Sequence, residues 1–464
     1  MIRSASYLPL ATLLLAGCAV GPNYSRPDAH APPVFRGAAG AAQQASFADL
    51  PWFDAFHDEV LQQLVKTALA KNYDLRVAVT RVEQARAAAI EARSPLFPQI
   101  GYGFDADRGQ STSFGVPFPG LKTGNTFFGA LNAAWEVDLW GRIRRLDEAA
   151  QADLLSSNDA RRGVIVTLVG DVTQAYYELL ELDLQLDIAR RTTDSFAGSL
   201  KLFQQRLDGG VGSKLDTSRA RASLASAAAT IPQLQQLIIL KEDQICILLG
   251  QNPGPITRDK TLLQQVMPPE IPVGLPSTLL ERRPDVRQAE DEVRAANARI
   301  GVAVADFFPK IGLTALYGGA STDLGQIARN SNKAWSVGAD VSGPIFQGGL
   351  LYGQYLQAKA SWEQAKLQYQ QTALEAFREV ADALAARQKL EEVRAQQATA
   401  VAAYEEAVSV SLERYTTGKA NYYEVLEAQQ DLFAAENSLA QTQRDQLIAV
   451  VQLYRTLGGG WQTQ

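Results

Sequence analysis

Residues that carry metal or redox chemistry are scarce in this sequence. Its 464 residues include two Cys, two Met and two His, the latter at His30 and His57. These are too few for a structural zinc cluster or for the usual catalytic site built on histidine. Basic residues do not exceed acidic ones either, because 44 Lys and Arg stand against 50 Asp and Glu, a net charge of -6. A protein that wraps nucleic acid carries a basic stripe, so that class is excluded.

The first 17 residues have the features of a secretory signal. Arg3 supplies the positive start, and the apolar run Leu8–Ala16 is too short to span a bilayer. The next residue closes the motif Leu15-Ala16-Gly17-Cys18, which resembles a bacterial lipobox and implies cleavage before Cys18 and a diacylglyceryl group on its thiol. Ala19 follows, which in lipoproteins resembles an outer-membrane address. The alternative is an ordinary cleaved signal with a chance cysteine.

Lipidation of Cys18 would make residues 18–49 an anchored extension. Each buried methylene of an acyl chain contributes roughly 0.8 kcal/mol, so several chains would hold this end in a membrane permanently. The other cysteine, Cys246, lies in an apolar stretch, where we expect a small buried hydrophobic side chain.

The remaining composition is ordinary, at 46% hydrophobic and 20% charged residues, and its length suits several domains or one large repeated one. Internal similarity indicates the second arrangement. Six positions recur after 208 residues: Arg206, Gly210, Ser213, Asp216, Leu249 and Gly250 match Arg414, Gly418, Asn421, Glu424, Leu457 and Gly458. Phe97-Pro98 likewise recurs as Phe308-Pro309.

We therefore predict a tandem duplication in which each half reads helix, strand, loop, strand, very long helix, glycine turn and long helix. The predicted bounds are repeat 1 at 50–250 with a β-hairpin at 100–139 and a helical hairpin at 142–249, a linker at 251–275, and repeat 2 at 276–464 with a β-hairpin at 310–346, a helical hairpin at 347–457 and a carboxyl-terminal tail.

Four segments alternate with a period of two, which is typical of strands with two different faces. Their apolar positions are Ile100, Tyr102, Phe104 and Ala106; Phe127, Leu131, Trp135, Val137 and Leu139; Ile311, Leu313, Ala315 and Tyr317; and Trp335, Val337, Ala339 and Val341. Strands of about ten residues can cross a bilayer when tilted. The apolar faces would meet lipid, the small and polar faces a wet lumen, and the loops 109–125 and 319–333 the outside.

Four strands cannot close a barrel, and an open edge is not tolerated in hydrocarbon because its N–H and C=O groups would lack partners. The alternation therefore demands oligomerisation, and three chains would give twelve strands. The alternative is a soluble sandwich with one solvated face.

Two stretches without proline, 141–208 and 346–417, predict single helices of about seventy residues, on the order of 100 Å long. Shorter helices follow at 213–249, with a kink expected at Pro232, and at 421–457. In the last helix Leu426, Phe433, Ala440, Leu447 and Tyr454 recur every seven residues, which indicates coiled-coil packing. A simple two-helix rod would show the same heptads.

On these residues the chain resembles the TolC-like outer-membrane efflux proteins, in particular the lipoprotein branch that serves resistance-nodulation-division (RND) pumps. The motifs that carry the resemblance are Cys18–Tyr24 (CAVGPNY) with Arg26-Pro27, Gly274–Arg287 (GLPSTLLERRPDVR), Ala295–Gly301 (AANARIG), Phe308-Pro309, and Arg414-Tyr415 with Gly418. They span nearly all of the mature chain, and the central motif is highly specific.

The resemblance implies an α+β membrane protein with an internal tandem repeat. Three chains would form a homotrimer with a twelve-stranded outer-membrane β-barrel, four strands from each, continued by a long periplasmic α-helical barrel with a belt from 50–93, 251–305 and the carboxyl end. The implied partners are outer-membrane lipid, a periplasmic membrane-fusion adaptor and an inner-membrane RND pump. The function would be a passive exit duct for small molecules, without catalysis and without a cofactor beyond the lipid on Cys18.

The controllable part of such a duct should be the ring of turns where the long helices reverse, because helix ends can splay or close. The turn residues Arg206, Gly210, Arg414, Gly418 and Lys419 are predicted to dock the adaptor, with the arginines and the lysine exposed. Glycine would permit the left-handed backbone of the reversal.

Acidic residues follow both turns. Glu424 and Glu427 are three residues apart and share a helix face, so in a trimer they and Asp216 would form an acidic ring that attracts cations. The resemblance places these three and Tyr415 near the closed aperture. The alternative is that the acids merely complement the helix dipole, at about 0.3–1 kcal/mol each.

Three rival functions stay open at this point. A duct for secreted proteins in a type I secretion system would use the same architecture. A structural or adhesive helical rod on the cell surface would leave the aromatic-rich strands unexplained. An enzyme is the most remote alternative, since the sequence shows no nucleophile-base pair or metal-ligand cluster.

Overall fold

The structure is a computed structural model that describes residues 19–38, 46–52, 57–110, 112–113, 116–117, 123–266 and 272–461. The predicted signal and Cys18 lie outside these residues. The chain divides into two compact units, and each is described here by itself. The first unit comprises residues up to 28, 81–158 and 288–370, and the second comprises 29–80, 159–287 and 371–464.

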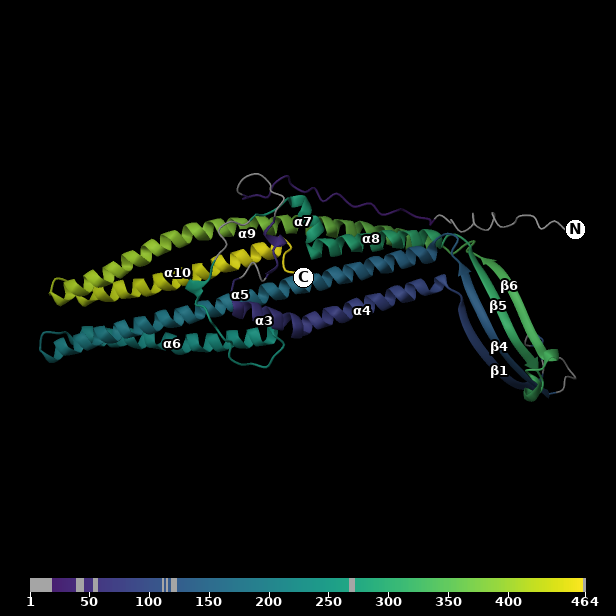
Figure 1. Ribbon diagram of the computed structural model, residues 1–464, viewed down its shortest axis with the longest axis horizontal. Helices are drawn as coiled ribbons and strands as arrows, with labels where there is room; N and C mark the ends of the chain where they lie inside the picture. Colours follow the sequence, from purple (N-terminus) through teal and green to yellow (C-terminus); the bar gives the residue numbers. More distant parts are fainter. Residues whose placement is uncertain are drawn as a thin grey trace. The chain divides into compact units, whose positions relative to one another are not determined.

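The first unit contains a four-stranded antiparallel sheet (Figure 1). Its strands, in spatial order, are β1 (Gln99–Gln110), β4 (Thr123–Val137), β5 (Lys310–Ser321) and β6 (Lys333–Ser342). The contact between β4 and β5 joins the hairpin of repeat 1 to that of repeat 2. Within the described part of the sheet, β1 and β6 are the edges. Two short strands, β2 (Thr112–Ser113) and β3 (Val116–Pro117), pair in the loop after β1.

The register sorts the side chains as the alternation predicts. Tyr102, Leu131, Tyr317 and Trp335 are successive cross-strand partners and so lie in one row on one face. They are 56–88% exposed, which is unusual for large apolar side chains on every strand of a sheet. The adjacent row, on the other face, contains only small residues: Gly103, Ala130, Gly318 and Ala334. These two rows agree with the predicted separation into an apolar face and a small, polar face. Phe128 and Leu316 are exceptions, because their registers place them on the small, polar face.

The ends of both predicted hairpins are too late, and at the first of them the reason is helix capping. Strand β4 ends at Val137, so Asp138 and Leu139 are not in it. The Asp138 carboxylate instead accepts hydrogen bonds from the N–H groups of Ile143 (3.0 Å) and Arg144 (2.9 Å), at the start of the next helix. Strand β6 ends at Ser342, before the predicted hairpin end at 346.

The long helices have the predicted lengths. Helix α5 (Arg142–Asp208) and helix α9 (Leu350–Thr416) each contain 67 residues and run through both units. Helix α9 begins three residues later than predicted, because Gly348 and Gly349 adopt positive φ angles of 57° and 92° that no helix accepts. Each long helix is followed by a helix of 35 residues, α6 (Lys214–Leu248) and α10 (Tyr422–Thr456). Helix α6 continues through Pro232, and a kink there stays a prediction.

Shorter helices precede each hairpin, as the repeat predicts. They are α3 (Glu59–Lys71) and α4 (Tyr73–Arg93) before β1, and α7 (Pro276–Arg282) and α8 (Pro284–Ala305) before β5. The predicted linker carries a 3₁₀ turn at Leu262–Gln264, and Val273 bridges to Ser46. Cys246 is buried, as predicted, at 3% exposure, and its thiol donates to the carbonyl of Gly254 (3.3 Å).

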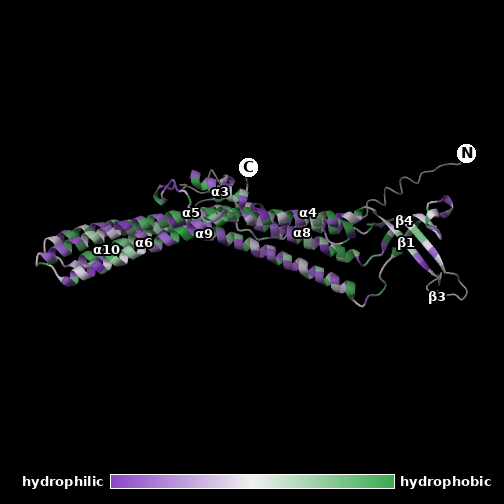
Figure 2. Ribbon diagram, turned by 90° about the horizontal axis from the view of Figure 1, so that it is seen from below, coloured by the Kyte–Doolittle hydropathy of each residue, from purple (hydrophilic) through white to green (hydrophobic). Residues whose placement is uncertain are grey.

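No helix among the described residues is both long enough and apolar enough to cross a membrane. Figure 2 shows why: hydrophilic and hydrophobic residues alternate along the helices instead of forming continuous hydrophobic runs.

Candidate functional site at the helical turns

Both long helices end in the same Schellman turn. After α5, Val211 donates to the carbonyl of Arg206 (2.9 Å) and Gly210 to that of Leu207 (3.0 Å). After α9, Lys419 donates to Arg414 (2.8 Å) and Gly418 to Tyr415 (3.0 Å). The φ angles of Gly210 and Gly418 are 73° and 75°, in the left-handed region that a side chain disfavours. The glycines do what the sequence predicts for the turns.

The helices that follow the turns are capped by matching residues of the two repeats. The Ser213 hydroxyl accepts from the N–H of Leu215 (3.1 Å), and the Asn421 side chain accepts from the N–H of Glu424 (3.3 Å). Each cap satisfies an N–H that a helix start leaves open. The recurrence after 208 positions is therefore a recurrence of caps as well as of turns.

An aromatic cluster joins the two turns within the second unit. Its buried members are Phe203, Ala220, Tyr415, Tyr422 and Val425. The Phe203 ring lies edge-on to Tyr415 (5.0 Å between centroids, 87°) and to Tyr422 (4.2 Å, 61°). Because Phe203 belongs to α5 and both tyrosines belong to repeat 2, this packing links the two helical hairpins. Of these residues, only Tyr415 was predicted to lie at the turns.

Arg206 adds a polar link across the same junction. Its guanidinium lies 4.7 Å from the centre of the Tyr415 ring, and Nη1 donates to the Tyr415 carbonyl (3.1 Å). Tyr415 is only 8% exposed, and burial raises its pKa although the charge of Arg206 opposes that shift. Arg206 is half-buried, so the prediction that it is exposed is wrong. Its guanidinium stacks on the turn of the other repeat.

The other predicted docking residues are exposed. Arg414 lies 3.7 Å from the Glu424 carboxylate, with side-chain exposures of 52% and 44%. Such an exposed pair contributes about 0–1 kcal/mol. Lys419 is also exposed. The two arginines that match between the repeats thus differ in role: Arg206 binds inside the chain, and Arg414 faces outward.

The predicted acidic residues lie next to the turns. Asp216 and Glu424 occupy the first turn of α6 and of α10, and Asp216 is half-buried near Tyr415 and Tyr422. Glu427 is exposed one helical turn after Glu424. This position also suits the alternative reading, in which the acids complement the dipole of their own helices.

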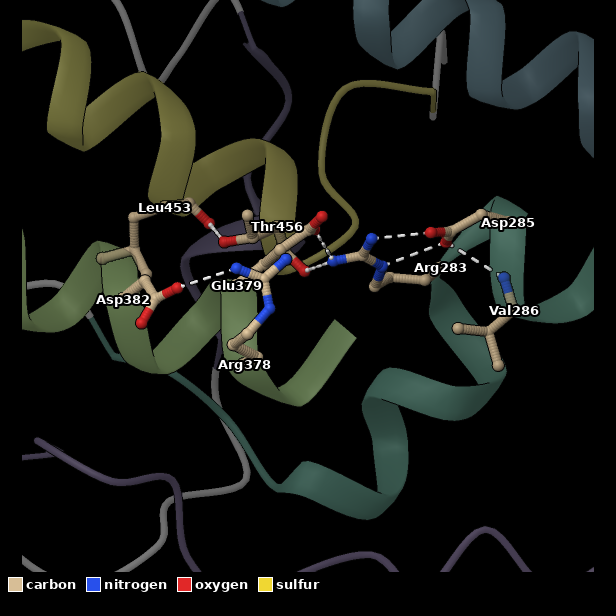
Figure 3. A network of polar contacts seen from close by, with 8 residues as sticks. All are labelled: Arg283, Asp285, Val286, Arg378, Glu379, Asp382, Leu453 and Thr456. Atoms are coloured by element: carbon tan, nitrogen blue, oxygen red, sulfur yellow. Dashed lines mark hydrogen bonds and ion pairs between the residues drawn. The ribbon is translucent and has the colours of Figure 1, made fainter. Parts of the chain in front are cut away.

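The most specific sequence motif has a structural role away from the turns. Arg283, between α7 and α8, is 8% exposed and binds three segments of the second unit (Figure 3). It makes two hydrogen bonds to Asp285 (3.0 and 2.6 Å), one to Glu379 of α9 (2.8 Å) and one to the Thr456 carbonyl of α10 (3.1 Å). Burial disfavours its charge, but the two carboxylates raise its pKa.

The amino-terminal motif lies along α8 in the first unit. The Asn297 amide donates to the Pro22 carbonyl (3.0 Å), and Glu290 accepts from Tyr24 (2.9 Å) and pairs with Arg26 (2.9 Å). Gly21 lies so close to α8 that a Cβ there would be 2.5 Å from the Cα of Gly301. Residues 21–26 are therefore held on the helix that precedes the second hairpin.

Metal chemistry has no visible site in the described part of the chain, where no three His, Cys, Asp or Glu side chains form a group that could hold an ion.

Comparison with known proteins connects this geometry to a family. The family model described as "Outer membrane efflux protein" matches residues 64–251 and 275–459. The probable efflux pump outer membrane protein TtgC of Pseudomonas putida is 34% identical, over 100% of this chain and 97% of TtgC. The cation efflux system protein CusC of Escherichia coli is 32% identical, over 97% of each. The solved outer-membrane channel OprN superposes with a TM-score of 0.90 at 33% identity, over 96% of this chain and 100% of OprN.

These matches confirm the family and the fold class predicted from the sequence. They extend over both hairpins and both helical turns, so the turn geometry described above belongs to the matched region. The chain belongs to the outer membrane efflux protein family.

Proposed function

We propose that three copies of this chain form a passive exit duct, the outer-membrane component of a tripartite efflux system. One observation carries the proposal: the described sheet has four strands, one face with large exposed apolar side chains, an opposite face of mostly small and polar ones, and edges at β1 and β6. An apolar face of this size belongs against lipid. The opposite face suits a water-filled lumen.

The open edges require other copies. A strand edge in hydrocarbon leaves backbone N–H and C=O groups without partners, at several kcal/mol each. Pairing β6 of one copy with β1 of the next removes both edges, and three copies give a closed ring of twelve strands.

The transported compounds are not specified by similarity. Relatives of comparable identity are named for different cargo, cations for CusC and toluene for another relative from Pseudomonas putida. Both names describe efflux, which favours an efflux duct over the alternative of a type I secretion duct. A wide duct selects little, so the specificity belongs to the pump and its adaptor. No step of this function requires catalysis by the chain itself.

The names of the relatives describe them as outer-membrane proteins. We place a lipid on Cys18 as the anchor and assign an inner-membrane RND pump and a periplasmic adaptor as partners. Energy comes from the pump. A contact in the first unit supports this anchor position: the N–H of Val20 donates to the carbonyl of Trp140 (3.0 Å), three residues after β4. Cys18 thus precedes a segment fixed beside the sheet.

The turns supply the gate in this proposal. Replacing Glu424 and Glu427 by Gln together should reduce the cation preference of channels in planar bilayers, because the acidic ring loses its charge. The matched control replaces Glu391 and Glu392 of α9 by Gln, and should leave the preference unchanged. Unaltered selectivity in the first variant would refute the gate assignment, since dipole complementation has no effect on ion selectivity.

Our proposed adaptor contact is formed by the exposed residues of both turns, which are Gly210, Arg414, Gly418 and Lys419. A Cβ at Gly418 meets nothing within 4 Å, so Gly418→Ala acts only through backbone strain, roughly 1–2 kcal/mol. We expect intact trimers with weaker crosslinking to the adaptor. Undiminished crosslinking and drug export would contradict the contact.

A further inference from the structure

An aromatic junction closes the contact between the two hairpins inside the chain. Trp140, three residues after β4, stacks on Phe308 with 4.6 Å between ring centroids and an interplanar angle of 24°. Its indole N–H donates to the carbonyl of Pro309 (2.8 Å). Phe308 and Pro309 directly precede β5, the strand that pairs with β4. Both rings are half-buried.

The repeat places a second pair of matching aromatic residues beside the two edge strands, β1 and β6. Phe97-Pro98 precedes β1 as Phe308-Pro309 precedes β5. The N–H groups of Phe97 and Phe308 both donate to the carbonyl three residues earlier, at 3.1 and 3.0 Å. Ile345-Phe346 follows β6 as Leu139-Trp140 follows β4. Glycines with positive φ lie shortly after both pairs, at Gly141 directly after Trp140 and at Gly348 and Gly349 after Gln347.

Phe97 and Phe346 make no such stacking contact within the described part of the chain. Phe346 is 88% exposed and Phe97 is 58% exposed, and Ile345 beside Phe346 is fully exposed. Phe346 follows β6 and Phe97 precedes β1, the two strands at opposite edges of the four-stranded sheet. An aromatic side chain exposed to this degree beside an open edge indicates an interface.

We propose that Phe346 of one copy stacks on Phe97 of the next copy and closes the contact between chains as Trp140 and Phe308 close the contact within a chain. The occupant of the exposed surface is thus a second copy of this chain. The argument is the internal symmetry: each hairpin presents an aromatic ring after its second strand to the aromatic ring before the first strand of its neighbour. This inference rests on the proposed trimer and adds the residues that join its copies.

The two junctions differ in the hydrogen bond that the ring can donate. Trp140 donates an N–H to the Pro309 carbonyl, whereas Phe346 has no donor for the matching carbonyl of Pro98. The contact between chains would therefore be the weaker version of the contact within the chain. Phe346→Trp would supply the missing donor.

Crosslinking tests the pairing directly. Phe97→Cys and Phe346→Cys are combined in one chain that keeps Cys18 and carries Cys246→Ala, and membranes are treated with a short bismaleimide. We expect covalent dimers and trimers after boiling in detergent. The matched control, Trp140→Cys with Phe308→Cys, should react within one chain and migrate as a monomer. Each single variant should give no trimer.

The outcomes separate the inference from the function. Trimers in unboiled samples without covalent dimers or trimers from the Phe97 and Phe346 pair would overturn the inference and leave the trimer standing. Absence of trimers in the unboiled wild-type protein would overturn both. A second readout does not use cysteine: Phe346→Trp should raise the temperature at which the detergent-resistant trimer dissociates, and Phe346→Ala should lower it. Equal temperatures for all three proteins would also overturn the pairing.

Discussion

Arg283 lies buried where the start of α8, helix α9 and the end of α10 meet, and its guanidinium makes four hydrogen bonds. The motif around it could be recognised in the sequence, but its partners Glu379 and Thr456 are 96 and 173 residues away. Nothing in a local pattern predicts contacts at that separation. The sequence therefore indicated that the residue is specific to the family without indicating what it binds.

Removing Arg283 should destabilise the helical unit strongly. Arg283→Ala removes the donor of the Thr456 carbonyl and of the Asp285 and Glu379 carboxylates, whose side chains are 46% and 39% exposed. Hydrogen bonds that involve a charged group contribute about 1.5–3 kcal/mol each. Arg378→Ala is the matched control, because Arg378 pairs with Asp382 at 3.2 Å with both side chains about two-thirds exposed and should cost at most about 1 kcal/mol. Thermal unfolding followed by circular dichroism measures the difference. Similar midpoints for the two variants would contradict the assigned role.

Glu181 gives the stability of the helical unit a pH dependence. It is 3% exposed, and burial raises its pKa although Arg444, 3.4 Å away, opposes the shift. The folded state therefore binds the Glu181 proton more tightly than the unfolded state. This contribution is present at acidic pH and is lost as the pH rises through the folded pKa. Asp171 and Glu436 have pKa values raised in the same direction, also mainly by burial.

The free energy of unfolding should accordingly rise as the pH falls from neutral toward the ordinary pKa of a carboxyl group. In Glu181→Gln, which cannot titrate, the rise should be smaller because only the other carboxylates contribute. Denaturant unfolding at several pH values measures it. A pH profile in the variant that is parallel to that of the wild type would show that Glu181 does not titrate with the proposed shift.

At the scale of elements, lengths and order followed from simple sequence features. The absence of proline predicted the two 67-residue helices, and strict alternation predicted all four main strands. The errors fall at element ends. Asp138 leaves the strand pattern to cap α5, and the glycine pair Gly348-Gly349 delays α9. The Asp138 cap and the glycine pair are both local features, but a prediction that uses only alternation or the absence of proline does not detect them.

The turns show the same limit. The recurrence after 208 positions predicted the role of the turn glycines and matched Ser213 with Asn421, whose capping only the structure shows. The stacking of Arg206 on Tyr415 crosses from one repeat to the other. Two matching arginines therefore looked equivalent in the sequence and are not equivalent in the structure. Only packing of the two helical hairpins separates their roles.

Loss of Arg206 should loosen the gate. Arg206→Ala removes a cation–π contact and a charge-assisted hydrogen bond, together about 1–3 kcal/mol, that hold the two turns of one chain together. We expect a higher single-channel conductance in planar bilayers, because the turns can separate more easily. Arg414→Ala is the control and should change conductance little, since its pair with Glu424 is exposed. Wild-type conductance in an intact Arg206→Ala trimer would argue against this link.

At the scale of the whole molecule, the amino terminus makes a prediction of its own. Mass spectrometry of the mature protein should find Cys18 as its first residue, modified by lipid. Cys18→Ala should abolish labelling by palmitate and keep residues 1–17, whereas Cys246→Ala should label normally because Cys246 is buried. An unmodified Cys18 in the mature protein would leave the alternative of an ordinary secretory signal.

The need for oligomerisation could be predicted from four strands and the cost of an open edge, and the sheet agrees with that reasoning in its strand number, order and faces. The number of copies could not be predicted in this way, because closure is satisfied by any ring that is large enough. Three copies come from the resemblance to the family. The exposed Phe97 and Phe346 add residues at which neighbouring copies can be tested.

The central claim is that three copies of the chain close a barrel, and that the small, polar face of the sheet lines its water-filled lumen. Conductance of the purified, lipidated protein in a planar bilayer tests it most directly. The account predicts discrete, cation-preferring current steps from a detergent-resistant trimer. A protein that stays a water-soluble monomer and gives no current steps would contradict it.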